Sequence, residues 1–340
     1  MNVPDFMGQL ALFDQLTELI DSVSTVAICA HTSPDGDAMG SGLALAEVIR
    51  RHWPGKRVTN LLADPDPVPR TYQFLPGADG FVHVEDYRED PDLFVCVDLS
   101  APKRLADAEA VMRRAHHVAV MDHHPSNAPF WEVGIVRPGA AAAGVIVTEY
   151  AMHLGCGITP SMAQCLLCAI VTDTGRFQYQ NTDGEALECA SALVEAGAPP
   201  AEVALRVYQS DRLSYLHLAA AVMSRITTFA HGRIAYSYAT SADLDKYDVP
   251  LAECDGLIDL VRCVEGSEVA LFLKEVPGGK VRGNLRSKCD KDVSAIARRM
   301  GGGGHVAAAG FTVEGDVDEA LQAVLPMLVG LFPDELGAAR

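Results

Sequence analysis

The sequence predicts an α/β fold, with a doubly wound parallel sheet in an N-terminal domain and a smaller α/β domain after it. In the first part of the chain, short apolar runs rich in β-branched residues alternate with segments of helix length. Such runs, without hydrophobic alternation, are typical of parallel strands buried on both faces. The length of 340 residues suggests about two domains, and the composition shifts at residues 197–200, GAPP.

The N-terminal domain is expected to span residues 1–196. Its continuous apolar runs predict strands at 25–30, 58–62, 93–98 and 117–122. Apolar residues at helical spacing predict helices at 8–22, 41–52, 101–115, 139–154, 160–171 and 184–196. A polar loop, 172–183, separates the last two helices.

Residues 197–225 are expected to form a helical linker of one or two amphipathic helices. In the C-terminal domain, 226–340, alternation or short apolar runs predict strands at 233–240, 268–276, 280–286 and 308–313. The PGG turn at 277–279 predicts a hairpin between two of these strands. Helices are expected at 292–300 and 317–331.

The chain is acidic, with 27 Lys and Arg against 45 Asp and Glu and a net charge of -18. It is therefore poorly suited to bind long nucleic acid nonspecifically, because such binding needs many phosphate contacts from Lys and Arg. Its apolar stretches fall short of the roughly 20 residues that cross a bilayer, and its start lacks a basic signal-peptide region. Nine cysteines are scattered, several within apolar runs. We expect a reduced, cytoplasmic protein with no membrane partner.

Histidine and aspartate side chains follow several of the expected strands at their carboxyl ends. Ligands of open α/β sheets bind just beyond such ends. A polar turn in which Asp37 caps the next helix would explain that residue alone, but not its neighbours. The side chains delivered in this way are His31, Asp35, Asp37, Asp98, Asp122, His123 and His124, and Asp173 follows an apolar helical run.

Six of these side chains form a plausible ligand set for metal ions: His31, Asp35, Asp37, Asp98, His123 and Asp173. Imidazole and carboxylate ligands without cysteine suit Mn²⁺, Fe²⁺, Co²⁺ or Zn²⁺. Six side chains are too many for one ion that keeps an open position, but they suit two ions about 3.5–4 Å apart that share a carboxylate. Such a pair activates water for displacement at phosphorus.

A second group of residues lies in the C-terminal domain. Residues 280–299 contain seven basic and two acidic side chains, which inverts the charge of the whole chain. Arg282 and Arg286 share one face of a strand with Asn284 between them, and their guanidinium groups suit a second phosphate. The glycines at 301–304, followed by His305, are expected to present backbone N–H groups.

These motifs resemble those of the DHH phosphoesterases. The resemblance rests, in order and spacing, on HTSPDGDAMGS (31–41), VDLS (97–100), DHHPSN (122–127) and TDTGRF (172–177). The DHHA1 domain of the same proteins is similar to KVRGNLRSK (280–288) and GGGGHVAAAG (301–310). The length and the pairing of RSK with GGGGH look most like the branch of bifunctional oligoribonucleases (nanoRNases) and 3′-phosphoadenosine 5′-phosphate (pAp) phosphatases.

The resemblance implies two divalent ions, expected to be Mn²⁺, in an active site that lies in a cleft between the two domains. One ion would be held by His31, Asp35 and Asp98, and the other by Asp37, Asp98, His123 and Asp173. Asp98 would bridge the ions, His124 would meet the scissile phosphate, and Asp122 would orient a neighbouring histidine. Members often carry Ser or Thr after the DHH segment, where this chain has alanines and glycine at 140–144.

The resemblance also implies a substrate-binding surface in the second domain. Its residues would be Arg282, Asn284, Arg286, Ser287, Lys288, Gly302, Gly303, Gly304 and His305. The implied substrates are short single-stranded RNA, hydrolysed to 5′-mononucleotides, and pAp, hydrolysed to AMP. No long duplex is expected as a partner, and a homodimer is left open.

Three other functions stay open at this point. A cyclic di-AMP or pApA phosphodiesterase could use the same site. An inorganic pyrophosphatase of the same superfamily is disfavoured, because that branch lacks the GGGGH segment. A non-catalytic nucleotide sensor would be supported by the loss of a metal ligand, and the motifs of this chain retain them all.

Overall fold

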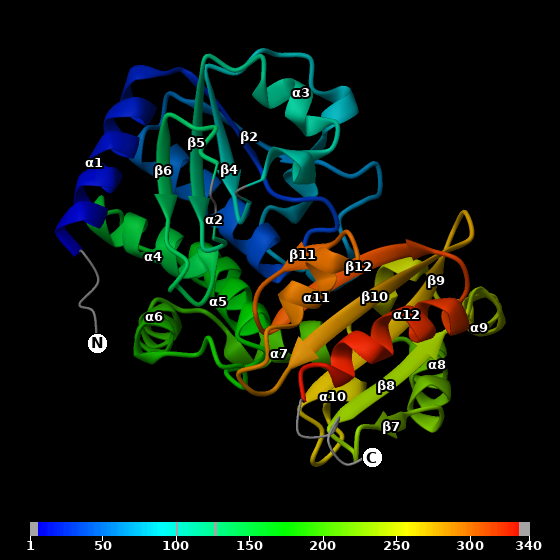
Figure 1. Cartoon of the computed structure of the whole chain (residues 1–340). Coiled ribbons are helices and arrows are strands. Elements are labelled where there is room, and N and C mark those ends of the chain that lie inside the picture. The colour runs from blue at the N-terminus through cyan, green and yellow to red at the C-terminus, as the bar shows by residue number, and fades with distance from the viewer. Residues whose placement is uncertain (1–5, 100, 126–127, 333–340) are drawn as a thin grey trace. The chain divides into compact units, whose positions relative to one another are not determined.

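The computed structural model describes residues 6–99, 101–125 and 128–332 and divides the chain into two compact units (Figure 1). The N-terminal unit is Met1–Ser210 and the C-terminal unit is Asp211–Arg340. The division falls inside residues 197–225, the segment expected to be a linker. The bounds of that linker stay a prediction. The cleft between the domains also stays a prediction. Of the quoted motifs, Ser100, Ser126 and Asn127 lie outside the described residues.

The N-terminal unit is built on a six-stranded sheet in which every pairing is parallel. Its strand order is β3-β2-β1-β4-β5-β6, so the chain winds outward from β1 in one direction and from β4 in the other. The strands are β1 (Thr25–Cys29), β2 (Arg57–Leu62), β3 (Val82–His83), β4 (Leu93–Val97), β5 (His117–Asp122) and β6 (Val133–Val136). The predicted doubly wound parallel sheet is confirmed.

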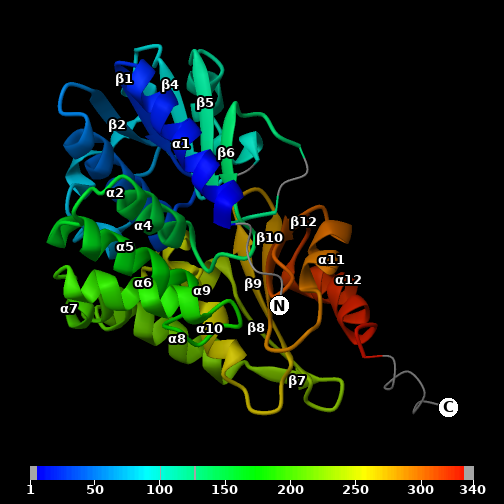
Figure 2. The ribbon, with the colours of Figure 1, turned by 90° about the vertical axis from the view of Figure 1, so that its left-hand side faces the viewer.

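Both faces of this sheet are buried, which explains why its strands lack hydrophobic alternation. One face packs against α1 (Phe6–Ser22), α2 (Gly36–His52) and α4 (Ala143–His153), with α5 (Pro160–Asp173) behind them (Figure 2). The other face packs against η4 (Pro102–Leu105) and α3 (Ala108–Met112). The unit is completed by α6 (Gly184–Glu195), α7 (Pro200–Tyr208) and the short turns η1 (Arg70–Tyr72), η2 (Ala78–Gly80) and η3 (Val84–Asp86).

Two expected helices differ from the structure. The helix expected at 101–115 is broken into η4 and α3, because Ala106 between them has a left-handed backbone (φ 45°). The helix expected at 41–52 begins at Gly36, because the Asp35 side chain accepts hydrogen bonds from the N–H groups of Asp37 and Ala38. Asp35 is therefore the N-cap of α2, and the interpretation that Asp37 caps this helix was wrong.

The C-terminal unit contains a second six-stranded sheet in the order β11-β12-β10-β9-β8-β7. The pair β8–β9 is parallel and the other pairs are antiparallel. The strands are β7 (Thr227–Phe229), β8 (Ile234–Ala239), β9 (Val269–Val276), β10 (Lys280–Ser287), β11 (Gly303–Gly304) and β12 (Ala308–Glu314). The expected hairpin joins β9 to β10.

Helices cover the two faces of this sheet unequally. One face packs against α11 (Val293–Arg299) and α12 (Val317–Val329). The apolar cluster on the other face joins β8 and β9 to α8 (Leu213–Ser224), α9 (Ser241–Tyr247) and α10 (Leu257–Arg262), with η5 (Leu251–Cys254) before α10. Among the described residues this cluster includes none from β10, β11 or β12, so their part of the face lies outside that core. No described helix is long and apolar enough to cross a membrane.

Small residues let α2 approach its neighbours closely. A Cβ atom added at Gly40 would overlap the backbone carbonyl oxygen of Cys165 in α5. Gly144 occupies a similar position, since a Cβ atom there would lie 2.7 Å from that of Ala169. The close packing of α2, α4 and α5 brings together residues that are more than 100 positions apart in the sequence.

We therefore expect Gly40→Ala to destabilise the N-terminal unit by about 1–3 kcal/mol, because the backbone of α5 must move. Thermal unfolding followed by circular dichroism should show a melting temperature lowered by several degrees. Gly42→Ala is the matched control in the same helix, because its Cβ would meet atoms only at 3.8 and 3.9 Å. The control should be neutral or stabilising, since alanine favours helix over glycine by about 1 kcal/mol. Equal melting temperatures for the two variants would contradict the packing argument.

Candidate metal centre and substrate face

The carboxyl ends of β1, β4 and β5 lie side by side in the sheet. His31 comes two residues after β1, Asp98 directly after β4, and His123 directly after β5. The strands β1 and β4 are neighbours at the position where the strand order reverses, which is where open α/β sheets bind ligands. The fold therefore places these side chains together.

Asp98 lies at the centre of this group. Its backbone is left-handed, with φ at 56°, a conformation that aspartate tolerates better than most residues. The residue is 1% exposed. Asp98 Oδ2 is 3.2 Å from His31 Nε2, and Asp98 Oδ1 is 3.3 Å from His123 Nε2. One carboxylate thus contacts two imidazoles through different oxygens.

The other predicted ligands divide between the two histidines. Asp35 Oδ2 lies 3.9 Å from His31 Nε2. Asp37 Oδ2 and Asp173 Oδ2 each lie 3.7 Å from His123 Nε2. The structure therefore brings all six predicted ligands together, as one group with His31 and a second group with His123, and Asp98 contacts both.

Backbone carbonyl oxygens contact the rings of His31 and His123 at the nitrogen that faces away from the carboxylates. His31 Nδ1 lies 2.8 Å from Thr32 O, and His123 Nδ1 lies 3.2 Å from Ala140 O. Because a carbonyl only accepts, Nδ1 is the donor in each ring, and Nε2 faces the carboxylates. This is the usual arrangement of histidines that bind a metal through the opposite ring nitrogen.

Asp37 is held by the N-terminus of α4. Its carboxylate accepts hydrogen bonds from the backbone N–H groups of Ala143 (2.6 Å) and Gly144 (2.9 Å) and from the Ser41 hydroxyl (2.8 Å). The side chain of Ala142, at the cap of α4, supplies no hydrogen bond, so Asp37 takes the capping role from another helix. The segment 140–144 needs no hydroxyl for this contact, because its backbone makes it.

The carboxylates of this group strongly affect one another. Burial raises the pKa of Asp37 well above its usual value, and Asp98 raises it further. Burial also raises the pKa of Asp173, to about 7, despite the opposing effect of His123. Burial lowers the pKa of His123, but Asp98, Asp173 and Asp37 outweigh this effect and raise it well above normal. So much negative charge in one place needs a positive charge to stabilise it.

The donor set fits divalent metal ions. Asp98 Oδ1 is buried and accepts no hydrogen bond from the described residues, although an imidazole nitrogen lies 3.3 Å away. Two atoms bound to one ion at about 2.1 Å and at right angles lie roughly 3 Å apart, close to the spacing of these two atoms. Oxygen and imidazole ligands without thiolate suit Mn²⁺ and related ions. These clustered residues could therefore bind metal.

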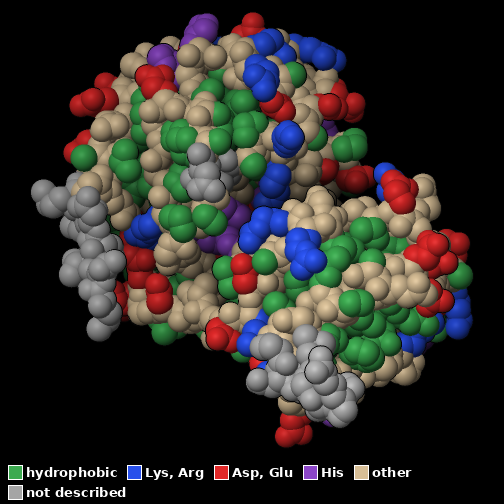
Figure 3. Space-filling model, in the orientation of Figure 1, with side chains coloured by type: hydrophobic (Ala, Val, Ile, Leu, Met, Phe, Trp, Pro, Cys, Tyr) green, Lys and Arg blue, Asp and Glu red, His purple; other side chains and the backbone are tan. Residues whose placement is uncertain are grey.

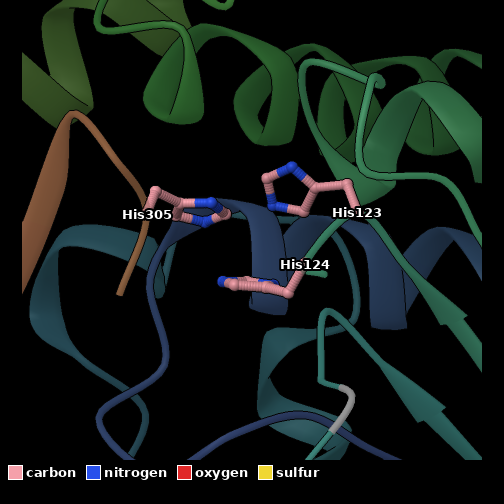
Figure 4. Close-up of side chains that lie close together, drawn as sticks. All are labelled: His123, His124 and His305. Carbon is pink, nitrogen blue, oxygen red and sulfur yellow. The ribbon is translucent and has the colours of Figure 1, made fainter. Parts of the chain in front are cut away.

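A second histidine–aspartate pair adjoins this centre. His124 Nδ1 lies 2.8 Å from Asp122 Oδ1, and Asp122 is completely buried. The rings of His123 and His124 meet edge to face, with centroids 4.7 Å apart (Figure 4). Asp122 thus contacts a neighbouring histidine, as the resemblance implies, and that histidine is His124.

In the C-terminal unit, Arg282, Asn284 and Arg286 occupy alternate positions of β10, opposite Thr312, Gly310 and Ala308 of β12. These three residues lie on the face of the sheet that α8 and α10 cover at β8 and β9. None of the three belongs to the apolar cluster beneath those helices. Basic side chains also gather near α11 and β11 on the face seen in Figure 3, where α11 ends in Arg298 and Arg299. A local basic surface therefore exists on this acidic chain.

Other predicted substrate-binding residues are differently placed. The glycine run does not present all its N–H groups, because that of Gly302 donates to Ala297 O at the end of α11. Gly303 and Gly304 form β11, the edge strand of the sheet, and His305 lies in the turn between β11 and β12. Glycine is required at residues 302 and 304. A Cβ atom at residue 302 would overlap the backbone of Gly310, and one at residue 304 would overlap the backbone of Ala308, both in β12.

Two more of these side chains bond within their own unit. The hydroxyl of Ser287 is buried and donates to Cys289 O, 3.1 Å away. The Lys288 ammonium donates to Val264 O, 2.7 Å away, and burial lowers its pKa. Substrate-binding roles for Ser287 and Lys288 stay a prediction, as do those of Arg282 and Arg286. Arg282 is exposed, and the Arg286 guanidinium uses one of its five N–H groups to donate to Leu285 O at 3.0 Å.

Sequence reasoning missed four polar contacts. Ser41 bonds to Asp37, and Asn181 bonds to Asp173. In the C-terminal unit, Lys274 is 2% exposed and its ammonium donates to Asp255 Oδ1, to which Asn284 also donates. Lys274 was detectable as the one basic residue in a mostly apolar run at 268–276, whereas no spacing rule identifies Ser41 or Asn181.

Comparison with known proteins agrees with this geometry. The family model "DHH family, N-terminal domain" matches residues 25–170, and the model "DHHA1 domain" matches residues 231–329. The "Bifunctional oligoribonuclease and PAP phosphatase NrnA" of Thermus thermophilus is 31% identical over 95% of this chain and 94% of its own length.

Two further relatives extend the comparison. The "Cyclic-di-AMP phosphodiesterase GdpP" of Geobacillus thermodenitrificans is 27% identical over 86% of this chain, but over only 45% of its own length. The crystal structure of an exopolyphosphatase-related protein from Bacteroides fragilis superposes with a TM-score of 0.87 at 24% identity, covering 96% of this chain and 97% of that one. The strand-end motifs, the two domain matches and the full-length relative together show that this chain belongs to the DHH family and carries a DHHA1 domain.

Proposed function

We propose that this chain is a metal-dependent phosphoesterase that hydrolyses short oligoribonucleotides to 5′-mononucleotides and pAp to AMP. The observation that carries the proposal is that five predicted metal ligands gather around a sixth, the buried carboxylate of Asp98. The relative from Thermus thermophilus, similar over nearly its whole length, bears the name of an enzyme with these two activities.

In this proposal the centre holds two divalent ions, with Mn²⁺ the expected metal. His31, Asp35 and Asp98 hold one ion, and Asp37, Asp98, His123 and Asp173 hold the other. A bound pair of such ions lowers the pKa of water toward neutrality and neutralises charge on the phosphoryl oxygens. Asp98 fixes the relative position of the two groups, because each of its oxygens faces a different histidine.

His124 is proposed to contact the scissile phosphate. Its Nδ1 lies 2.8 Å from the buried carboxylate of Asp122, which fixes the orientation of the ring. An imidazole N–H that faces a phosphoryl oxygen stabilises the negative charge that develops there.

The substrate end away from the reacting phosphate is assigned to the C-terminal unit. Arg282 and Arg286, on the same face of β10, offer guanidinium groups to a second phosphate. The chain as a whole carries a charge of -18, so a long polyanion would meet repulsion beyond this surface. Short substrates with few phosphates are therefore favoured.

A cyclic di-AMP or pApA phosphodiesterase is the second candidate. The relative named as a cyclic-di-AMP phosphodiesterase supports it, although this chain matches less than half of that protein. The metal centre would serve both reactions equally. A non-catalytic nucleotide sensor is disfavoured, because the whole predicted ligand set is retained and brought together.

We expect Asp98→Asn to abolish turnover, because loss of the shared charge loosens both ions. Asp35→Asn is the matched comparison: the Asp35 side chain is 52% exposed, belongs to the His31 group alone, and keeps its helix-capping oxygen as asparagine. Activity of Asp35→Asn should recover in part when Mn²⁺ is raised. Initial rates against Mn²⁺ concentration test this. Near-normal activity of Asp98→Asn at limiting metal would refute the shared-ligand assignment.

Arg286→Ala should weaken kcat/KM for pAp and dinucleotides by about ten- to a hundredfold, because a charge-assisted contact contributes roughly 1.5–3 kcal/mol. The small ester bis-p-nitrophenyl phosphate lacks the second phosphate, so its hydrolysis should change little. Lys280→Ala is the control, since Lys280 lies on the same strand but pairs with Glu314 at its far end. Equal losses on both kinds of substrate would argue against a role for Arg286 in binding the distal phosphate.

A substrate panel with Mn²⁺ tests the proposed function directly. It should contain pAp, pApA, cyclic di-AMP and single-stranded RNAs of one sequence, from dimer to 24-mer. We expect kcat/KM to be highest for pAp and for RNAs of two to about five nucleotides and to fall steeply with length, because the net charge of -18 repels further phosphates beyond the basic residues of 280–299. Salt should weaken short substrates only modestly.

Two results of this panel would change the conclusion. A clear preference for cyclic di-AMP or pApA would favour the second candidate. Equal or better efficiency on the 24-mer, with steep salt dependence, would indicate a processive exonuclease and contradict the preference for short substrates.

A further inference from the structure

We propose that Asn181 is a positioning residue that holds Asp173 in place and so sets the metal affinity of the His123 group. Asn181 lies in the polar loop after α5, outside every motif identified in the sequence. This inference rests on the proposed metal centre, and it assigns to the chain a residue on which that centre depends.

The amide nitrogen of Asn181 contacts three oxygen atoms. Nδ2 lies 2.9 Å from Ala141 O, 3.1 Å from Asp173 O and 3.3 Å from Asp173 Oδ2, and these three acceptors share its two N–H groups. All three atoms only accept when Asp173 is ionised, so the amide can take only this orientation. The Asn181 side chain therefore contacts both the backbone carbonyl and the carboxylate of Asp173, a proposed metal ligand.

A strained turn brings Asn181 back to Asp173. Three consecutive residues after α5 have left-handed backbones: Gly175 (φ 55°), Arg176 (φ 63°) and Phe177 (φ 62°). Such a conformation costs roughly 1–2 kcal/mol for each residue other than glycine. The turn is closed by bonds from Arg176 N to Val171 O and from Phe177 N to the Thr174 hydroxyl. Strain of this kind persists where the surrounding contacts require it.

The contact of Asn181 with Ala141 O connects Asp173 to the segment 140–144. That segment also supplies Ala140 O to His123 Nδ1 and the N–H groups of Ala143 and Gly144 to Asp37. All three side chains of the His123 group are thus anchored on one stretch of backbone, two directly and Asp173 through Asn181. Asp173 alone depends on an intermediary, because it arrives from the far end of α5.

Asp173 has particular need of this support. It lies at the carboxyl end of a helix, where the helix dipole disfavours a carboxylate, and it faces the other acidic ligands. Hydrogen-bonded partners behind a metal-binding carboxylate typically account for 10–100-fold in metal affinity. Removing the amide should free the carboxylate to turn away from His123 Nε2, from which it now lies 3.7 Å.

The test is Mn²⁺ binding to the full-length chain without substrate, followed by isothermal titration calorimetry and by the electron paramagnetic resonance signal of free Mn²⁺. Asn181→Ala should weaken one of two sites by about 10–100-fold and leave the other unchanged. Asn181→Asp should weaken it at least as much, because a second carboxylate then faces Asp173. Gln178→Ala, an exposed side chain in the same loop, is the control and should bind as the wild type does.

Wild-type affinity at both sites in Asn181→Ala would overturn the proposal. Equal weakening of both sites together with a lowered melting temperature would also overturn it, because it would show a merely structural role. If saturating Mn²⁺ restores the kcat of Asn181→Ala, the positioning role is supported. A wild-type chain that binds two Mn²⁺ ions but hydrolyses no substrate of the panel would refute the proposed function alone, while a wild-type chain that binds none would refute both.

Discussion

The carboxylate of Asp98, buried yet ionised, is the constraint on which the N-terminal unit depends. Moving a carboxylate out of water costs several kcal/mol unless charges and hydrogen bonds compensate it. Two histidines from neighbouring strands supply this compensation and, with burial opposing them, hold the pKa of Asp98 well below its usual value. A site that stabilises one central negative charge so strongly, with further carboxylates around it, is organised to attract cations.

The parallel sheet makes this arrangement possible. Its neighbouring strands end at one edge, so ligands that are distant in sequence meet without long loops. Both faces are covered, and glycines such as Gly40 and Gly144 allow the helices to approach closely enough for α4 to offer its N–H groups to Asp37. The same packing places the end of α5, and with it Asp173, beside His123.

Charge is distributed unequally along the chain. The N-terminal unit gathers His and Asp side chains at its strand ends, while residues 280–299 of the C-terminal unit contain seven basic side chains against two acidic ones. In the proposed function the N-terminal unit would therefore hold the metal ions and the scissile phosphate, and the C-terminal unit the distal phosphate. In the C-terminal unit the ammonium of the buried Lys274 donates to Asp255, while Arg282 and Arg286 lie on the same face of the neighbouring strand β10.

The sequence by itself determined the eight longer strands, though not β3, β6, β7 and β11, as well as most helices and the six side chains that the structure brings together at Asp98. Apolar periodicity and residue type at strand ends are local properties, and they persist whatever the packing. Tertiary structure decided the start of α2 at the Asp35 cap, the break at Ala106, the engagement of Ser287 and Lys288, and the contact of Asn181 with Asp173. These features depend on which hydrogen-bond partners and which free space the packed elements offer, and residues far apart in the chain supply many of them.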